Sequence, residues 1–154
     1  MTKNLLNENI TSLDISATDN IDAIKQLGQI LVNNNYIEPS YIDSVIEREA
    51  SFPTGLNLTS AGIAIPHASP NNNVSQNSIA VARLKTPIKF HSMENPDEEI
   101  YIDMIFMLAL ASSTEHLDIL KKLFIAFQNE ELVSQLKTCQ NKQTFLKLLA
   151  DKLK

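Results

Sequence analysis

Residues Arg48 to His67 read R-E-A-S-F-P-T-G-L-N-L-T-S-A-G-I-A-I-P-H. Within this segment, Ile63–Ile65 form a short apolar run that is typical of a buried strand. Pro66 has no backbone N–H to donate, so strand pairing is predicted to stop there. The next residue is His67, whose imidazole ring changes between its neutral and cationic forms near neutral pH. The segment therefore predicts a reactive side chain at the end of a strand, where the sites of α/β proteins tend to lie.

A helix and a turn are predicted upstream of this strand. Ser40 and Asp43 fit a capping box, and the helix that follows has an apolar stripe consisting of Ile42, Val45, Ile46 and Ala50. At the usual rotation per residue, Arg48 lies about 200° from Ile46 and so points away from the stripe. Phe52–Gly55 has Pro at the second and Gly at the fourth position of a type I turn, which would join the helix to the strand.

The remaining segments predict more strands in the middle of the chain and helices on either side. Thr18–Asn20 offers N-caps for a helix that ends at Asn33–Asn35, and Gly28 inside it marks close packing. Extended segments are predicted at Leu13–Ile15, Ile79–Leu84, Pro87–Phe90 and Ile100–Ala111, with an acidic loop at Ser92–Glu99. Later helices begin at a capping box, Ser112 to Glu115, at Asn129 and near Gln143. The order of these elements predicts an α/β fold, a three-layer α/β/α sandwich with a small mixed β-sheet.

Length and composition limit the class of protein. The 154 residues fit one domain, spanning residues 1–154, and a net charge of −5 argues against nonspecific binding to nucleic acid. Cys139 is the only cysteine, which excludes an internal disulfide and favours a reducing compartment. The amino terminus has no signal-peptide pattern, and the longest uncharged apolar run, Met104–Ala111, is too short to span a bilayer. We therefore expect a cytoplasmic protein whose membrane role, if any, comes through a partner.

The sequence lacks the motifs of several common types of nucleotide-binding, hydrolytic and zinc-binding site. Three scattered glycines allow neither a P-loop nor a dinucleotide-binding G-x-G-x-x-G, and no G-x-S-x-G elbow is present. A tri-histidine zinc site is an alternative in principle, but no H-x-H, H-x₃-H or H-E-x-x-H spacing supports it. Asp103 interrupts the longest apolar segment, and we interpret it as a structural carboxylate.

The segment from Arg48 to His67 resembles the active-site signature of a known family. It is similar to the IIA components of the fructose/mannitol class (type 2) of the bacterial phosphoenolpyruvate-dependent sugar phosphotransferase system (PTS). The P-T-G-L form is most similar to the galactitol-specific branch. R-L-K-T-P-I-K-F at Arg83–Phe90 and E-H-L-D-I-L-K-K-L at Glu115–Leu123 follow in the order of that family. The resemblance extends from about Ile21 to Leu149, and it implies the same α/β/α fold.

The resemblance also implies an activity, that of a phosphotransferase component with a phosphohistidine intermediate. His67 would accept a phosphoryl group on Nε2 from phospho-HPr and pass it to a cysteine of the cognate IIB component. The membrane component IIC would be involved only indirectly, and this chain would not bind the sugar. No cofactor or metal is implied. The transported compound would be galactitol or a related sugar or sugar alcohol.

Three further residues are candidates for supporting roles, Arg48 and His116 through the resemblance and Thr54 through its hydroxyl, and each has a simpler alternative. Arg48 would stabilise the phosphoryl group; the alternative is a solvated surface arginine. His116, in the first turn of a helix, would donate an N–H to a phosphoryl oxygen; the alternative is an inert, partly exposed ring. Thr54 is a candidate hydroxyl donor, or it only shapes its turn. His91 matches no motif residue, and we expect it to be exposed and structural.

Two other functions are compatible with the same motifs. One is a regulatory module of the nitrogen-PTS type, which would act by phosphorylation-dependent protein binding, because a phosphoryl group adds up to about two negative charges to a surface. The other is an inactive scaffold, which phosphoenolpyruvate, Enzyme I and HPr would not label. An apolar patch around His67 is expected if two partner proteins dock there in turn.

Overall fold

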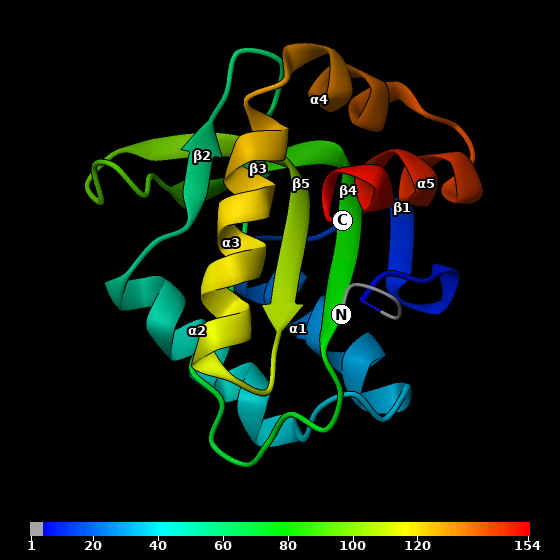
Figure 1. Cartoon of the computed structure of the whole chain (residues 1–154). Helices are drawn as coiled ribbons and strands as arrows, with labels where there is room; N and C mark the ends of the chain where they lie inside the picture. The colour runs from blue at the N-terminus through cyan, green and yellow to red at the C-terminus, as the bar shows by residue number, and fades with distance from the viewer. Residues whose placement is uncertain (1–4) are drawn as a thin grey trace.

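The computed structural model describes residues 5–154, and these form one mixed β-sheet between two layers of helices (Figure 1). The strands are β1 (Thr11–Ile15), β2 (Gly55–Asn57), β3 (Gly62–Ala64), β4 (Ser78–His91) and β5 (Glu99–Ala109). Their order in the sheet is β1-β4-β5-β3-β2. The pairs β1–β4 and β3–β5 are parallel, whereas β4–β5 and β2–β3 are antiparallel. The predicted small mixed sheet is therefore confirmed.

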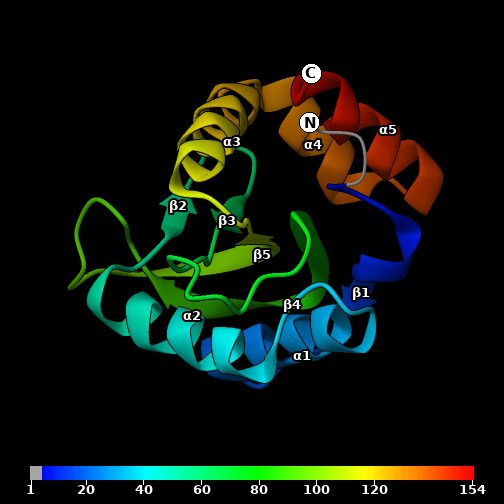
Figure 2. The same cartoon turned by 60° about the horizontal axis from the view of Figure 1, so that its bottom comes forward.

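Helices cover both faces of this sheet, as Figure 2 shows. A short 3₁₀ turn at Glu8–Ile10 precedes β1, and the helices are α1 (Asn20–Asn33), α2 (Pro39–Ser51), α3 (Ser113–Phe127), α4 (Glu130–Thr138) and α5 (Lys142–Lys152). One face is covered by α1 and α2, and the other by α3, α4 and α5. The three-layer prediction is confirmed. None of the helices within residues 5–154 is long and apolar enough to cross a membrane.

The central strand β5 supplies side chains to both hydrophobic layers. Successive side chains of a strand point to opposite faces, so Met104 and Phe106 pack toward α3–α5 while Ile105 and Met107 pack toward α1 and α2. All four are fully buried. The predicted central strand is therefore confirmed. Asp103 accepts a hydrogen bond from the backbone N–H of Gly62 at 2.9 Å, which ties β3 to β5 and confirms its structural interpretation.

Strand β4 is longer than the sequence predicts. Ile79–Leu84 and Pro87–Phe90 are parts of one continuous strand, so the prediction of two separate extended pieces is wrong. The pairing with β5 shifts between Arg83 and Ile88, which accommodates the extra residues as a bulge. Proline is tolerated at a bulge because no ladder hydrogen bond is required of it there. The loop that follows ends one residue earlier than predicted, because Glu99 already belongs to β5.

Helix α1 matches the prediction, and its glycine has the expected role. The Asp19 side chain caps the helix by accepting a hydrogen bond from the Asp22 N–H at 2.8 Å. A Cβ atom at Gly28 would lie 2.5 Å from the side chain of Ile42 in α2. Because real Cβ atoms do not approach side chains so closely, glycine allows the two helices to pack tightly here, as predicted.

Helix α2 differs from the prediction in its start and in its buried face. It begins at Pro39 without a side-chain cap, so the capping box predicted at Ser40 and Asp43 is wrong. Proline suits the first helical position because it has no backbone N–H that would need a hydrogen-bond partner there. The buried residues are Tyr41, Val45 and Glu49, and the predicted stripe residue Ala50 is exposed. The buried face is thus rotated from the apolar stripe toward Arg48, which is half-buried beside it.

The segment after α2 is extended instead of forming the predicted type I turn. The chain bends at Phe52, and Gly55 is already the first residue of β2. A Cβ atom at Gly55 would lie 2.6 Å from the backbone oxygen of His91, so this glycine is needed for close approach of two chain segments. The extended path places Thr54 directly beside the strand that leads to His67, as the hydrogen bonds described below show.

Candidate active site

The sheet brings two of the candidate histidines together. Strands β3 and β5 are parallel neighbours, so their carboxyl ends lie at the same edge of the sheet. Figure 1 shows that β5 leads into α3 at this edge. His67 follows β3 by three residues, and His116 lies in the first turn of α3. The centroids of the two imidazole rings are 5.4 Å apart. The structure therefore places these two predicted site residues in one site.

Two adjoining hollows open at this edge of the sheet, and Arg48 and His67 line both. The first, which we call the histidine hollow, has a volume of about 220 Å³ and is also lined by His116. The second, the apolar hollow, has a volume of about 370 Å³. Its further lining includes Met93, Pro96, Leu120 and Phe124. A ligand or partner side chain in either hollow would meet both His67 and Arg48.

The His67 ring is held in one tautomer. Its Nδ1 lies 2.8 Å from the carbonyl oxygen of Ile65. A carbonyl oxygen can only accept, so Nδ1 carries the proton and donates it, and Nε2 keeps its lone pair. Burial lowers the pKa of His67, as does the neighbouring charge of Arg48, against the opposing effect of the Ile65 hydrogen bond. The ring is therefore prepared to act as a neutral nucleophile at Nε2.

Backbone contacts on both sides hold the residue itself. The carbonyl of Pro66 accepts from the N–H of Leu108 at 3.0 Å. The N–H of Ala68 donates to the hydroxyl of Tyr41 at 3.1 Å, and that hydroxyl donates to the carbonyl of Leu108 at 2.7 Å. Burial raises the pKa of Tyr41 to about 12, so its hydroxyl keeps its proton. These bonds fix the loop that presents His67.

His116 is more buried than either sequence interpretation assumed. The predicted helix start is confirmed, because the Ser112 hydroxyl accepts from the N–H of Glu115 at 3.2 Å and caps α3. The second bond of a capping box differs, since the Glu115 carboxylate accepts from the Ser112 hydroxyl at 3.0 Å and not from its backbone N–H. His116 is only 8% exposed, and its Nε2 is buried without a hydrogen-bond partner among residues 5–154. Burial first, and then the nearby His67 and Arg48, lower the pKa of His116 to about 4. The ring is neutral at pH 7 and has a free polar nitrogen beside His67.

The depressed pKa of His116 predicts a pH dependence of stability. The unfolded chain binds a proton at this ring near pH 6.5, whereas the folded protein binds it only near pH 4. The contribution to stability is therefore fully present above pH 6.5 and is lost as the pH falls to about 4. In urea unfolding at a series of pH values, the free energy of unfolding of the natural protein should fall relative to His116→Gln by about 1–3 kcal/mol across this window. A difference that stays constant from pH 7 to pH 4 would contradict the buried, neutral ring.

Arg48 supplies the positive charge of the site. Its Nε is buried without a hydrogen-bond partner, and no ion pair within residues 5–154 involves it. Its guanidinium carbon lies 5.1 Å from the centre of the Phe52 ring, a distance at which a cation and an aromatic face attract. An unpaired guanidinium beside two neutral imidazoles is suited to binding a phosphoryl group or another oxyanion.

The Thr54 hydroxyl donates to another residue of the protein in this structure. Its side chain is buried, and its hydroxyl donates to the Glu49 carboxylate at 2.8 Å. Thr54 lines the apolar hollow, but a hydroxyl has one proton, and here that proton is bonded to Glu49 and is not directed at a bound group. Of the two interpretations, the structure supports the one in which Thr54 shapes the chain around the site.

His91 and Cys139 do not belong to the lining of the two hollows. His91 is exposed at the end of β4, where its Nδ1 lies 2.9 Å from the carbonyl of Pro96, and it lines neither hollow. Cys139 is the C-cap of α4. No group of three histidine, cysteine or acidic side chains in the described part of the chain is arranged to hold a metal ion. The structure thus separates the third histidine of a tri-histidine zinc site from the other two.

Apolar side chains surround the two hollows. Phe52 is 63% exposed and Leu117 is 57% exposed, and each lines a hollow that contains His67. The sequence stripe assigned Leu117 to the buried face of α3, which is wrong, because His116 takes the inward position in this turn. Leu120 and Phe124, also assigned to the stripe, are only partly buried. This exposed apolar rim is a surface on which a protein partner can dock.

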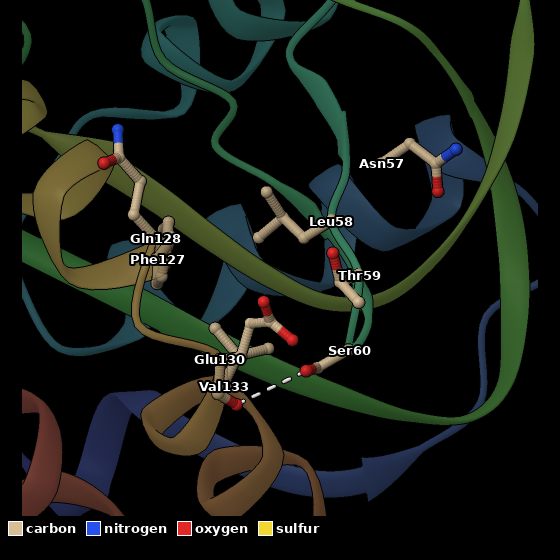
Figure 3. Close-up of a pocket in the computed structure, with 8 residues that line it drawn as sticks. All are labelled: Asn57, Leu58, Thr59, Ser60, Phe127, Gln128, Glu130 and Val133. Atoms are coloured by element: carbon tan, nitrogen blue, oxygen red, sulfur yellow. Dashed lines mark hydrogen bonds between the residues drawn. The ribbon is translucent and has the colours of Figure 1, made fainter.

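A third hollow, of about 230 Å³, lies between the β2–β3 connection and the junction of α3 and α4, as Figure 3 shows. The Ser60 hydroxyl donates to the carbonyl of Glu130 across it, at 3.3 Å. Its described lining includes one acidic side chain, that of Glu130, and no histidine, arginine, lysine or cysteine. Without a nucleophile or a cation, this hollow offers no chemistry comparable to that of the histidine hollow.

Sequence reasoning missed two residues that support the site, Tyr41 and Glu49. Both lie on the buried face of α2, each four residues from Val45, which is also buried. A periodicity search over apolar residues alone does not include a tyrosine or a glutamate. The i, i+4, i+8 spacing of these residues is the signal that would have found them.

The fold and the site define a small α/β protein with a half-buried histidine, whose Nδ1 bonds a backbone carbonyl, beside an arginine at one edge of the sheet. The chain belongs to the family described as "Phosphoenolpyruvate-dependent sugar phosphotransferase system, EIIA 2", whose model matches residues 4–152. The resemblance seen in the sequence is therefore confirmed. Membership supports the role of a phosphoryl carrier, because the IIA components of this system are phosphotransfer proteins.

Individual relatives have names with different specificities. The mannitol-specific phosphotransferase enzyme IIA component of Geobacillus stearothermophilus is 33% identical over 147 residues, with 94% of each chain covered. The galactitol-specific EIIA component of Escherichia coli strain K12 is 27% identical over 141 residues, with 89% of this chain and 92% of that protein covered. An ascorbate-specific EIIA component of the same strain also matches. The galactitol branch is thus among the relatives, together with two other specificities.

Solved structures show the same fold. The mannitol enzyme IIA in its complex with phosphorylated enzyme IIB from Escherichia coli superimposes with a TM-score of 0.79 at 24% identity, covering 95% of this chain and 97% of that one. The nitrogen regulatory protein IIA-Ntr of Neisseria meningitidis has the same TM-score and identity, covering 94% and 96%. Because a transport component and a regulatory protein share this fold, the fold alone does not separate the two functions.

Proposed function

We propose that this protein accepts a phosphoryl group from phospho-HPr on Nε2 of His67 and passes it to a cysteine of a IIB component. The observation that carries this proposal is the 2.8 Å contact of His67 Nδ1 with the Ile65 carbonyl, which leaves the Nε2 lone pair free. The ring that bears this lone pair lines both hollows with Arg48. His67 would thus be the phosphoacceptor, and Arg48 and His116 would support it.

The transfer is an in-line displacement at phosphorus. The Nε2 lone pair of His67 forms the new P–N bond as the P–N bond of the donor's phosphohistidine breaks and its electron pair returns to the donor ring. Nδ1–H, bonded to the Ile65 carbonyl, stabilises the positive charge that develops on the attacking imidazole. In the second step a thiolate of the IIB component attacks phosphorus, and the electron pair of the P–Nε2 bond returns to His67.

Charge on the phosphoryl oxygens is stabilised by groups at the edge of the site. Arg48 would donate from its guanidinium, and His116 would donate from Nε2 when that nitrogen carries the proton of the neutral ring. The first turn of α3, where His116 lies, also presents the positive end of a helix dipole. Each of these interactions is strongest when negative charge is spread over the oxygens in the transition state.

Both partners must leave after each transfer, so weak, rapidly exchanging interfaces are expected. The exposed apolar rim at Phe52 and Leu117 would contact each partner in turn. The structure of a related mannitol enzyme IIA with phosphorylated enzyme IIB supports a IIB component as acceptor. The membrane component would act only through that IIB, and the sugar would not touch this chain.

Galactitol or a related sugar or sugar alcohol is the proposed transported compound, because the P-T-G-L segment is most similar to the galactitol branch. Onward transfer to purified IIB components tests this. Labelled protein is expected to lose its phosphoryl group to a galactitol-type IIB faster than to mannitol- or ascorbate-type IIB proteins. Faster transfer to the mannitol-type or the ascorbate-type IIB protein would indicate that mannitol or ascorbate is the transported compound in place of galactitol. A protein that is labelled by HPr but passes phosphate to none of them would support the regulatory alternative instead.

A further inference from the structure

A buried carboxylate lies behind the site, in contact with neither hollow. Glu49 is only 6% exposed, although it is an acidic residue on a helix. Its Oε2 accepts from the backbone N–H of Thr54 and its Oε1 accepts from the hydroxyl of Thr54, both at 2.8 Å. The carboxylate thus binds one residue twice, and this residue lies in the extended segment that replaces the predicted turn.

The hydrogen bonds continue from Thr54 to the phosphoacceptor. The Thr54 hydroxyl oxygen accepts from the backbone N–H of Ile65 at 3.2 Å. The Ile65 carbonyl then accepts from Nδ1 of His67 at 2.8 Å. One chain of hydrogen bonds therefore links Glu49, Thr54, Ile65 and His67. In each bond the chemistry of the two groups decides which one donates.

Placing a carboxylate here has a cost that an apolar side chain would avoid. Burial raises the pKa of Glu49 to about 6, although the Thr54 hydrogen bonds oppose this. What the carboxylate provides is a fixed orientation of the Thr54 hydroxyl. Ile65 follows the last residue of β3, so its N–H lies beyond the strand pairing, and the Thr54 oxygen is the acceptor that satisfies it.

We propose that Glu49 and Thr54 are positioning residues, which hold Ile65 so that its carbonyl keeps the proton on Nδ1 of His67 and the lone pair on Nε2. The inference rests on the proposed function for its effect on rate, whereas its effect on the tautomer concerns the free protein alone. Glu49 lines neither hollow, and the Thr54 hydroxyl is bonded to Glu49 and Ile65, so neither residue is assigned a bond to the phosphoryl group.

The decisive comparison is between Thr54→Val and Thr54→Ser. Valine has the shape of threonine without the hydroxyl, so it removes the hydroxyl's bond to Glu49 and its bond from Ile65, whereas serine retains both. The bond from the backbone N–H of residue 54 to Glu49 remains in either variant. In Thr54→Val, the ¹⁵N spectrum of the imidazole is expected to show a shift of His67 away from the single Nδ1–H tautomer. The initial rate of labelling by phospho-HPr should fall about 10- to 100-fold, by analogy with hydrogen-bond partners that orient metal-binding histidines. Thr54→Ser should restore the tautomer and most of the rate.

A second variant makes the test independent of the packing of valine. In Glu49→Gln an amide faces Thr54, so its NH₂ group would point at the Thr54 hydroxyl and reverse the hydrogen bond. The same change of tautomer and rate is expected. Asp43→Asn removes one negative charge from an exposed position of the same helix and should leave both readouts unchanged.

Three outcomes would overturn the proposal. The first is a folded Thr54→Val or Glu49→Gln protein in which His67 keeps the Nδ1–H tautomer. The second is either variant being labelled by phospho-HPr at the rate of the natural protein. The third is a labelling rate that falls equally in Thr54→Ser and Thr54→Val. The Thr54 hydroxyl would then have no role in positioning, and Glu49 and Thr54 would only support packing. If the natural protein itself is not labelled, the proposed function fails, but the ¹⁵N spectra still decide whether Glu49 and Thr54 set the tautomer of His67.

Discussion

Replacing His67 by alanine is expected to abolish labelling by phosphoenolpyruvate, Enzyme I and HPr. The reason is that His67 supplies the only nucleophile in our account, and alanine has no atom that can form the bond to phosphorus. Rate losses on removal of such a nucleophile reach about 10⁶-fold, which in a labelling assay is the complete absence of signal. The measurement is transfer of ³²P from labelled phosphoenolpyruvate to the purified protein.

Two further histidine variants serve as controls for this result. His91→Ala removes an exposed histidine that lines neither hollow, and it should be labelled like the natural protein. His116→Ala should be labelled more slowly, because it loses a supporting ring and keeps the nucleophile. Labelling that survives in His67→Ala and disappears in His116→Ala would reverse the assignment of the two rings.

Replacing Arg48 by glutamine is expected to slow phosphoryl acceptance about 10²- to 10³-fold, the effect typical of losing one donor to a developing oxyanion. The guanidinium has no ion pair within the described chain, so its charge is available to the phosphoryl oxygens. Arg48→Lys retains the charge and loses the planar fork of donors, so its rate should lie between those of glutamine and arginine. Rapid-quench measurement of the transfer from phospho-HPr at saturating donor separates this effect from weaker docking.

The matched control for Arg48→Gln is Lys25→Gln, which removes one positive charge from an exposed position of α1 that lines none of the hollows. Its rate should equal that of the natural protein. An Arg48→Gln protein with the same maximal rate and only a higher requirement for phospho-HPr would show that Arg48 binds the donor protein and does not stabilise the transferring group.

Local sequence signals predicted the parts of this fold that depend on neighbouring residues. The caps at Asp19 and Ser112 start their helices because each bonds a backbone N–H three residues ahead. The central strand and the position of His67 after a strand were likewise predictable from apolar runs and proline. The pairing of His67 with His116 required the family resemblance, since the parallel neighbours β3 and β5 are separated by β4 in sequence.

The errors arose where tertiary contacts override a local pattern. Pro87 reads as the boundary between two extended pieces, but a bulge accommodates it within β4. In α3, Leu117 reads as a core residue, but the buried position in its turn belongs to His116. The role of Thr54 depends on Glu49, a residue whose side chain would be expected in solvent from its position on a helix. Only the folded chain shows that the two side chains are buried together.

The most direct test of the account is to determine which nitrogen atom carries the phosphoryl group. The protein is labelled with ¹⁵N at its histidines, phosphorylated with HPr, and examined by ³¹P and ¹⁵N nuclear magnetic resonance with His67 assigned through His67→Ala. A phosphoryl group bonded to Nε2 of His67, with the proton retained on Nδ1, is the predicted result, because the Ile65 carbonyl holds that proton. A phosphoryl group on Nδ1 of His67, or on either nitrogen of His116, would contradict it.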